Sequence, residues 1–119
     1  MARITPTQRT LRELRNRGLV CGIVERYNSY TSTRHDLFGF IDIIALCPER
    51  GIIGVQSCGQ SFSEHRKKIV EERTQQAKEW LECGGVIELW GWRKIKVKRG
   101  GKAMIWSPRI EEITLNDLI

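Results

Sequence analysis

Two neighbouring runs of Ile, Leu and Val, at residues Phe38–Leu46 and Gly51–Val55, most constrain what this chain can fold into. The polar break Pro48–Gly51 separates them, and Pro followed by Gly between two β-branched runs is a turn signal. The sequence therefore predicts two adjacent strands joined by a short turn. Asp42 lies inside the first run, where a buried carboxylate needs a cation or several hydrogen-bond donors. We interpret this residue as the strongest functional indication in the sequence.

Length and composition favour an ordinary globular protein. The chain has 119 residues, of which 40% are hydrophobic and 29% charged, and this suits a single domain over residues 1–119 with one core. The apolar runs are too short to cross a bilayer, and no signal-peptide segment follows Met1, so we expect a cytoplasmic protein without a membrane partner. The formal net charge of +6 favours a polyanionic partner, with nucleic acid as the leading candidate.

The four cysteines do not indicate a zinc site. Cys21, Cys47, Cys58 and Cys83 include no C-x-x-C pair, and secretory disulfides need an oxidising compartment. We therefore expect free thiols, most of them buried.

The predicted elements alternate in a way that defines the fold class. Thr5 or Thr7 can cap the first helix, and Gly18 follows its last turn. In chain order we expect a helix at Thr7–Arg17, strands at Leu19–Tyr27, Phe38–Leu46 and Gly51–Ser57, a helix at about Ser63–Cys83, strands at Val86–Trp92 and Lys102–Trp106, and a short strand from Arg109 with a helical turn begun at Thr114. A polar loop is expected at Asn28–His35, and a basic extension with a tight Gly-Gly turn is expected at Arg93–Gly101, before the chain returns as the strand Lys102–Trp106. A meander followed by a helical crossover predicts an α/β fold, a mixed β-sheet flanked by helices.

Polar side chains on the two central strands suggest a metal site. Asp42 and Gln56 lie at similar distances from the turn and can be cross-strand neighbours. Asp36 lies six residues before Asp42, at the start of the same strand or in the loop that leads into it. Hard cations such as Mg²⁺ or Mn²⁺ take oxygen ligands, and such a cation would polarise a phosphate and activate a water.

These residues also carry a family resemblance. The pattern G-x-x-D-I-I-A at residues 39–45, followed by G-V-Q-S-C at residues 54–58, resembles the PD-(D/E)XK nuclease superfamily. The small phage-type and Holliday-junction-resolvase-like members are the most similar. The resemblance implies a restriction-endonuclease-like αβββαβ core and a metal-dependent DNA endonuclease, which could be structure-specific, in a bacterial or phage-infected cell. It also implies that Asp42 is the metal-binding aspartate.

Two positions depart from that superfamily's pattern. Gln56 occupies the place of a second acid and Cys58 the place of a lysine, so one negative and one positive charge are missing. The lysine would stabilise the charge that develops on the phosphate. Asp36 could restore the negative charge, and Lys67 or Lys68 of the following helix could supply the positive one.

Other roles remain open for the same residues. Asp42 could be a buried acid in a salt bridge to Arg34 or Arg66, Gln56 could satisfy backbone groups at a strand end, and Asp36 could cap a loop. The four tryptophans favour a core role over a base-stacking platform.

Basic residues near the C-terminus suggest a DNA surface. They alternate in a segment that suits a phosphate-lined groove, although a solvated hairpin would show the same pattern. The expected nucleic-acid contacts are Arg34, Arg66, Arg93, Lys94, Lys96, Lys98 and Arg99, together with the arginines of the first helix. The alternative function is a catalytically decayed protein of the same fold that binds DNA or a protein partner. A homodimer is an open expectation, because so small a chain presents little DNA-binding surface.

Overall fold

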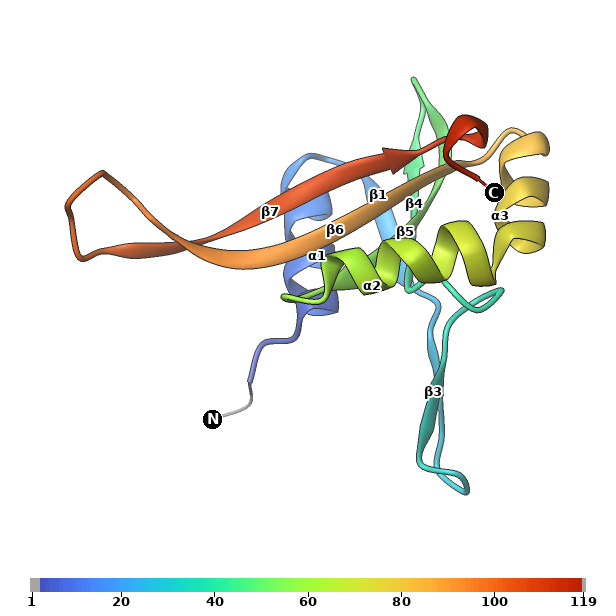
Figure 1. Cartoon of the computed structure of the whole chain (residues 1–119), viewed down its shortest axis with the longest axis horizontal. Helices are drawn as coiled ribbons and strands as arrows, with labels where there is room; N and C mark the ends of the chain where they lie inside the picture. The colour runs from blue at the N-terminus through green and yellow to red at the C-terminus, as the bar shows by residue number, and fades with distance from the viewer. Residues whose placement is uncertain (1–2, 119) are drawn as a thin grey trace.

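A five-stranded mixed sheet in the order β1-β4-β5-β6-β7 forms the centre of the molecule (Figure 1). The structure is a computed structural model and describes residues 3–118. Only the β5–β6 pair is parallel within this sheet, and its other pairs are antiparallel. The strands are β1 (Val20–Ile23), β4 (Ile43–Cys47), β5 (Gly51–Cys58), β6 (Val86–Lys96) and β7 (Met104–Ile113). The predicted α/β fold with a mixed sheet flanked by helices is confirmed.

Helix α1 (Pro6–Asn16) covers one face of the sheet. It begins with a capping box, in which the Thr5 hydroxyl accepts from the Gln8 N–H and the Gln8 side chain accepts from the Thr5 N–H. Leu14 is buried against strand residues that include Ile43, Val55 and Trp90. The predicted first helix and its Thr5 cap are confirmed, with bounds shifted by one residue.

The second helical region covers the opposite face and is not one helix. It consists of α2 (Phe62–Lys67), the π-helical turn η1 (Lys68–Glu72) and α3 (Thr74–Glu82). The prediction of a continuous helix over residues 63–83 is wrong, because the Arg73 N–H donates to the Lys68 carbonyl at 2.8 Å, five residues back. Within residues 3–118, no helix is long and apolar enough to cross a membrane.

The first half of the predicted strand at Phe38–Leu46 is a tight turn instead. Phe38 and Gly39 both have left-handed backbone, with φ of 56° and 84°, and a strand cannot contain such residues. The φ of 84° at Gly39 favours glycine, and a Cβ added there would also lie 2.5 Å from the Nε of the Arg73 side chain. The chain enters β4 only at Ile43, and the turn places Asp36 and Asp42 close together.

A small hairpin of β2 (Arg26–Asn28) and β3 (Thr33–His35) projects from the sheet (Figure 1). The predicted strand Leu19–Tyr27 is thus confirmed over Val20–Ile23 but does not continue in the same sheet, and the predicted loop Asn28–His35 ends in a strand. The chain leaves the sheet because the N–H groups of Val24 and Glu25 both donate to the Asp42 carbonyl, at 2.8 and 3.3 Å. The hairpin is largely exposed, and so it lacks the apolar alternation that reveals a strand.

The C-terminal hairpin is longer than predicted. Strands β6 and β7 pair continuously, from Ile87 opposite Ile113 to Lys96 opposite Met104. The basic segment from residue 93 thus begins inside β6, and the two separate strands expected at 102–106 and after 109 are one strand. Thr114 then caps a short 3₁₀ turn, η2 (Leu115–Asp117), where the sequence predicts a helical turn.

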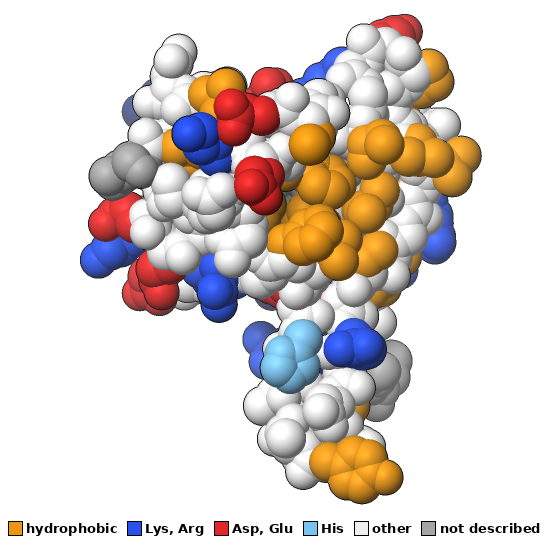
Figure 2. Space-filling model, turned by 90° about the vertical axis from the view of Figure 1, so that its right-hand side faces the viewer, with side chains coloured by type: hydrophobic (Ala, Val, Ile, Leu, Met, Phe, Trp, Pro, Cys, Tyr) orange, Lys and Arg blue, Asp and Glu red, His pale blue; other side chains and the backbone are white. Residues whose placement is uncertain are grey.

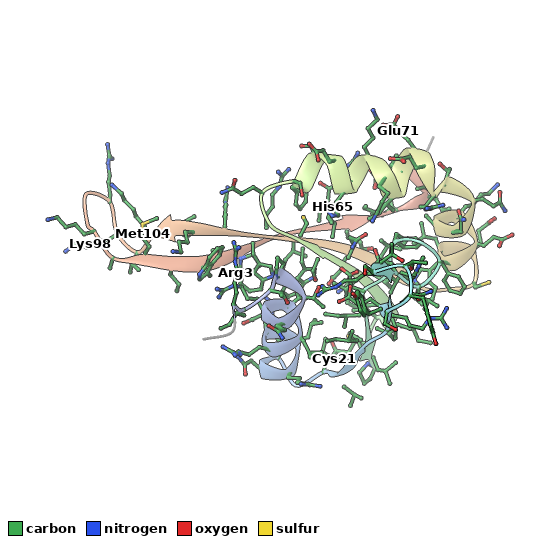
Figure 3. The ribbon with its side chains drawn as sticks, turned by 90° about the horizontal axis from the view of Figure 1, so that it is seen from below. Arg3, Cys21, His65, Glu71, Lys98 and Met104 are labelled. Atoms are coloured by element: carbon green, nitrogen blue, oxygen red, sulfur yellow. The ribbon has the colours of Figure 1, made fainter. Side chains whose placement is uncertain are left out.

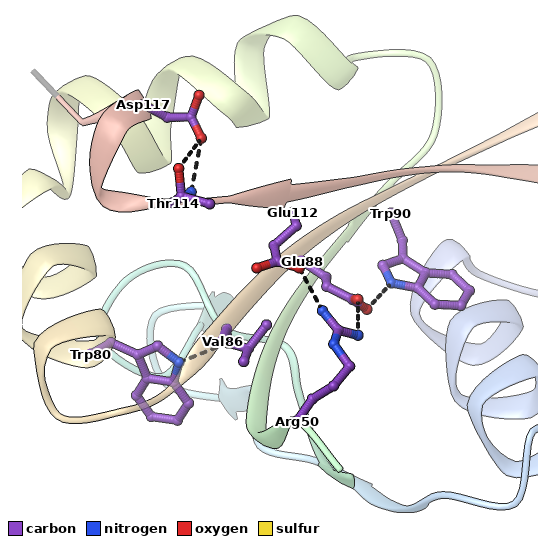
Figure 4. Close-up of polar contacts among 8 residues, drawn as sticks. All are labelled: Arg50, Trp80, Val86, Glu88, Trp90, Glu112, Thr114 and Asp117. Carbon is purple, nitrogen blue, oxygen red and sulfur yellow. Dashed lines mark hydrogen bonds and ion pairs between the residues drawn. The ribbon is translucent and has the colours of Figure 1, made fainter.

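Arg50, in the turn between β4 and β5, ties that turn to β6 and β7 (Figure 4). Its guanidinium donates to Glu88 and to Glu112, each at 2.7 Å. The buried Glu88 also accepts from the Trp90 indole N–H at 3.0 Å. A buried carboxylate needs such partners, so this cluster fixes the position of the β4–β5 turn.

Part of the sheet on the α3 side carries exposed apolar side chains. Val20, Leu46 and Ile52 face each other across β1, β4 and β5 and are exposed. The rings of Phe38 and Trp80 lie beside one another, with centroids 6.2 Å apart. Figure 2 shows hydrophobic side chains gathered on this side of the molecule, above the β2–β3 hairpin.

Candidate metal centre

Asp42 and Gln56 meet on the α2 side of the sheet. The Asp42 N–H, one residue before β4, donates to the Val55 carbonyl at 2.8 Å. The Gln56 Nε2 of β5 then donates to the Asp42 Oδ2 at 2.8 Å. The predicted cross-strand placement of these two residues is confirmed, and their side chains lie on the same side.

Three carboxylates converge at this point. Glu25, Asp36 and Asp42 each offer an oxygen, and these oxygens all lie within 4.8 Å of one another. Glu25 comes from the break between β1 and β2, and Asp36 follows β3. Carboxylate oxygens at such separations suit Mg²⁺, Mn²⁺ or Ca²⁺.

Glu25 is the residue of this group that sequence reasoning missed. In the sequence it continues the apparent strand at residues 19–27, and no local motif marks it. It reaches the cluster because the backbone turns away from the sheet at Val24. The only signal in the sequence is a carboxylate at the end of a predicted apolar strand, which is weak.

The environment disfavours a negative charge on Asp42. Burial is the main cause, followed by a hydrogen bond with Asp36 and by the charge of that residue, and together they raise the pKa of Asp42 to about 8. The Ser57 N–H, which donates to the Asp42 Oδ2 at 2.7 Å, opposes this shift. Burial and the Asp36 charge also raise the pKa of Glu25. A cation bound among these oxygens would favour the charged forms of Asp42 and Glu25.

Gln56 contains a buried oxygen without a partner. Its Nε2 donates to Asp42 and, at 3.4 Å, to Asp36. Its Oε1 has no hydrogen-bond partner within residues 3–118 although the side chain is only 3% exposed, and an unsatisfied buried acceptor costs about 1–3 kcal/mol. Rotation of the amide about its terminal bond would direct Oε1 towards the carboxylates. A cation among these oxygens would favour that orientation.

Lys68 is the cation closest to the carboxylate cluster. Its Nζ lies 3.5 Å from the Asp36 Oδ2, and it opens the π-helical turn η1. Lys67 is the other lysine that could replace the missing motif lysine. It is exposed and makes no ion pair within the described residues. Beside Asp36 a pocket of about 460 Å³ is lined by the cations Arg34, Lys68 and Arg73. This arrangement can accept an anionic group such as a phosphate.

The alternative roles for Asp42, Asp36 and Gln56 are not observed. Arg34 pairs with Glu25 at 3.9 Å, and Arg66 pairs with Glu111 and Asp117. Neither arginine forms a salt bridge to Asp42 within residues 3–118. The Gln56 side chain donates to the carboxylates of Asp36 and Asp42, and the Asp36 carboxylate also accepts from Lys68. Within residues 3–118, neither side chain binds a backbone group.

Cys58 cannot replace a motif lysine. Burial first, and then the charge of Asp42, raise the pKa of its thiol to about 11, so it stays neutral. All four cysteines are free, as predicted. The expectation that most are buried is wrong, because only Cys58 is buried and Cys83 is exposed.

The expected DNA-contacting residues of the C-terminal hairpin lie outside the core. Figure 3 shows Lys98 near the tip of this hairpin, which extends away from the rest of the molecule. All members of the set are exposed, namely Arg93, Lys94, Lys96, Lys98 and Arg99. The hairpin therefore presents a row of cations to solvent.

Comparisons with protein families, with curated proteins and with solved structures found no match. The resemblance to the PD-(D/E)XK superfamily therefore stays an expectation from the sequence. The geometry of the carboxylate cluster and its neighbouring cations is what supports a function for this chain.

Proposed function

We propose that this protein is a metal-dependent DNA endonuclease that hydrolyses phosphodiester bonds, with Mg²⁺ or Mn²⁺ as its cofactor. One observation carries the proposal: carboxylate oxygens of Glu25, Asp36 and Asp42 lie within 4.8 Å of one another. Gln56 supports it, because rotation of its amide would turn the Oε1 that has no hydrogen-bond partner within residues 3–118 towards the carboxylates as a neutral oxygen ligand.

The residues around the cluster suit hydrolysis of a phosphodiester. Asp36, Asp42 and Glu25 would hold the cation, and Gln56 would complete its oxygen ligands. A cation at this point would polarise the phosphate and lower the pKa of an attacking water. Lys68 would stabilise the negative charge that develops on the phosphate, which is the role of the missing motif lysine.

DNA is the proposed substrate because cations line the pocket beside the cluster and further cations are exposed on the β6–β7 hairpin. Arg34 and Arg73 line the pocket beside Asp36, and the β6–β7 hairpin adds its exposed basic residues. Such residues bind phosphates without regard to sequence. A preference for branched DNA and a homodimeric state are further parts of this proposal.

A second candidate is a DNA-binding or protein-binding relative that does not cleave. The neutral Gln56 and Cys58 favour it, because each stands where the superfamily usually has a charge. This candidate predicts salt-sensitive DNA binding without metal-dependent cleavage.

One assay separates the two candidates. The purified protein is incubated with branched, single-stranded and double-stranded DNA in Mg²⁺, Mn²⁺ or EDTA. We expect cleavage with Mg²⁺ or Mn²⁺, none with EDTA, and none by Asp42→Asn. Glu13→Gln is the matched control, because Glu13 lies on α1 and pairs with Arg17, and this variant should cleave normally. Absence of cleavage with every metal would favour the second candidate, and full activity of Asp42→Asn would exclude the proposed site.

A further inference from the structure

A groove separate from the carboxylate cluster lies between the N-terminal arm, α1 and the β6–β7 hairpin. Its volume is about 900 Å³, and its lining includes Arg3, Arg9, Trp92, Lys94 and Trp106. Figure 3 shows Arg3 at this position, between α1 and the hairpin. The groove lies on the sheet face that α1 covers, whereas the carboxylate cluster lies on the face of α2.

The cations of this groove are free of acidic partners. Arg3, Arg9, Arg93 and Lys94 line it, and none of them forms an ion pair with a carboxylate within residues 3–118. Arg50 and Arg66, by contrast, each bind two carboxylates. The groove therefore has uncompensated positive charge that suits a polyanion.

Trp106 gives this groove an aromatic surface. Its side chain is 39% exposed, whereas Trp90 and Trp92 are buried. The Arg9 guanidinium lies 4.1 Å from the centre of its ring and the Lys94 Nζ lies at 5.4 Å. Trp106 is therefore not a core residue, although the sequence predicts a core role for all four tryptophans.

The floor of the groove is held rigidly. The Trp92 indole N–H donates to the Thr10 hydroxyl at 2.8 Å, and this hydroxyl also accepts from Ser57 at 2.8 Å. These bonds fix α1 against β5 and β6. The wall that α1 and the sheet form is thus in place before a ligand binds, which lowers the entropic cost of binding.

An exposed aromatic ring among cations fits one class of ligand. In a single strand the bases are free to stack on an aromatic side chain while cations bind the backbone phosphates. In a duplex the base faces are already stacked, so a protein ring of this kind has nothing to contact and the phosphates alone are bound. We propose that this groove binds single-stranded DNA, with Trp106 stacking on a base and with Arg9 and Lys94 contacting the adjacent phosphates. This binding rests on the groove alone and does not require cleavage at the carboxylate cluster.

The test measures binding without catalysis. Fluorescence anisotropy is recorded in EDTA with a labelled oligothymidine of about 12 nucleotides, within the usual footprint of single-strand sites, and with a duplex of equal length. We expect the parent to bind the single strand more tightly than the duplex. Trp106→Ala should weaken single-strand binding by about tenfold, the effect of removing one base stack, and Trp106→Phe should retain most of the affinity.

Two matched controls keep the test specific. Ile105→Ala removes an exposed apolar side chain from the opposite face of the same strand, and Arg12→Ala removes an exposed arginine of α1 outside the groove. Both should bind the single strand more tightly than Trp106→Ala and Arg9→Ala do. The Trp106→Phe protein should also lose most of the DNA-induced quenching of tryptophan fluorescence. A parent that binds duplex as tightly as single strand, or a Trp106→Ala protein with unchanged single-strand affinity, would overturn the inference and leave the proposed cleavage to its own assay.

Discussion

At the scale of single residues, Asp42 is the buried member of the carboxylate cluster. Its side chain is 3% exposed and bonds to Gln56 and to the Ser57 N–H. Burial and the neighbouring Asp36 raise its pKa from 3.8 to about 8. A carboxylate that is unfavourable when charged is typical of a site that a cation completes.

The raised pKa of Asp42 predicts a pH dependence of stability in EDTA. The folded state binds the Asp42 proton more tightly than the unfolded state does, so this residue's contribution is fully present below about pH 4 and is lost as the pH rises through about 8. Asp42→Asn has no such proton to lose. We therefore compare the free energies of unfolding of Asp42→Asn and of the parent, both measured with urea. The value for the variant minus the value for the parent should increase from pH 5 to pH 8, a range that lies between the Asp42 pKa values of 3.8 and about 8. A difference that stays constant with pH would contradict the assigned environment.

We expect the replacement of two adjacent lysines, Lys67 and Lys68, to affect the cleavage rate differently. Lys68→Ala should lower the rate of metal-dependent cleavage by about 10²–10³, the usual effect of losing one transition-state charge partner. Lys67→Ala removes the same charge from an exposed neighbouring position and should cleave at close to the parent rate. Equal rates for both variants would show that the charge beside Asp36 is not used.

At the scale of elements, Thr10 joins α1 to the sheet. Its hydroxyl donates to the Pro6 carbonyl at 3.0 Å and accepts from Ser57 and Trp92. One donor and two acceptor positions are all that a hydroxyl has, so this fully buried group is completely satisfied. Through Ser57, whose N–H donates to Asp42, the same contact supports the carboxylate cluster.

We therefore expect Thr10→Val to lower the free energy of unfolding, although the volume of the side chain hardly changes. The change leaves the Trp92 N–H and the Ser57 hydroxyl without their acceptor, and the expected loss is about 2 kcal/mol. Urea unfolding measures it. Thr31→Val, at the exposed turn of the β2–β3 hairpin, is the control and should unfold within about 0.5 kcal/mol of the parent.

The elements that local patterns specify are those that the sequence could predict. The Thr5 cap of α1, the turn at residues 48–51 and the apolar runs of β4 and β5 depend on neighbours in the chain. The turn and the two runs led to the predicted Asp42–Gln56 contact. The left-handed pair at Phe38 and Gly39 lies beside the Arg73 side chain, which is far away in the sequence. Glu25 likewise reaches the cluster through backbone bonds to Asp42. Such tertiary contacts leave no periodic signal.

At the scale of the whole molecule, the cationic C-terminal hairpin extends away from the body (Figure 3). Neutralising its basic residues should flatten the dependence of duplex-DNA affinity on salt, by about 0.9 in the log–log slope for each phosphate that the hairpin no longer binds. The set to change to Gln is Arg93, Lys94, Lys96, Lys98 and Arg99. Lys78→Gln, on exposed α3, should leave the slope unaltered. An unaltered slope for the hairpin variant would place the DNA surface elsewhere.

The central claim is that Glu25, Asp36 and Asp42 form a metal centre, and calorimetric titration with Mn²⁺ tests it most directly. We predict saturable binding of Mn²⁺ by the parent, retained by Glu13→Gln and abolished by Asp42→Asn and by Glu25→Gln. The Glu25 variant is decisive, because only the folded chain brings this residue to the cluster. Equal Mn²⁺ binding by the parent, Asp42→Asn and Glu25→Gln, or no binding by the parent at millimolar Mn²⁺, would contradict the account.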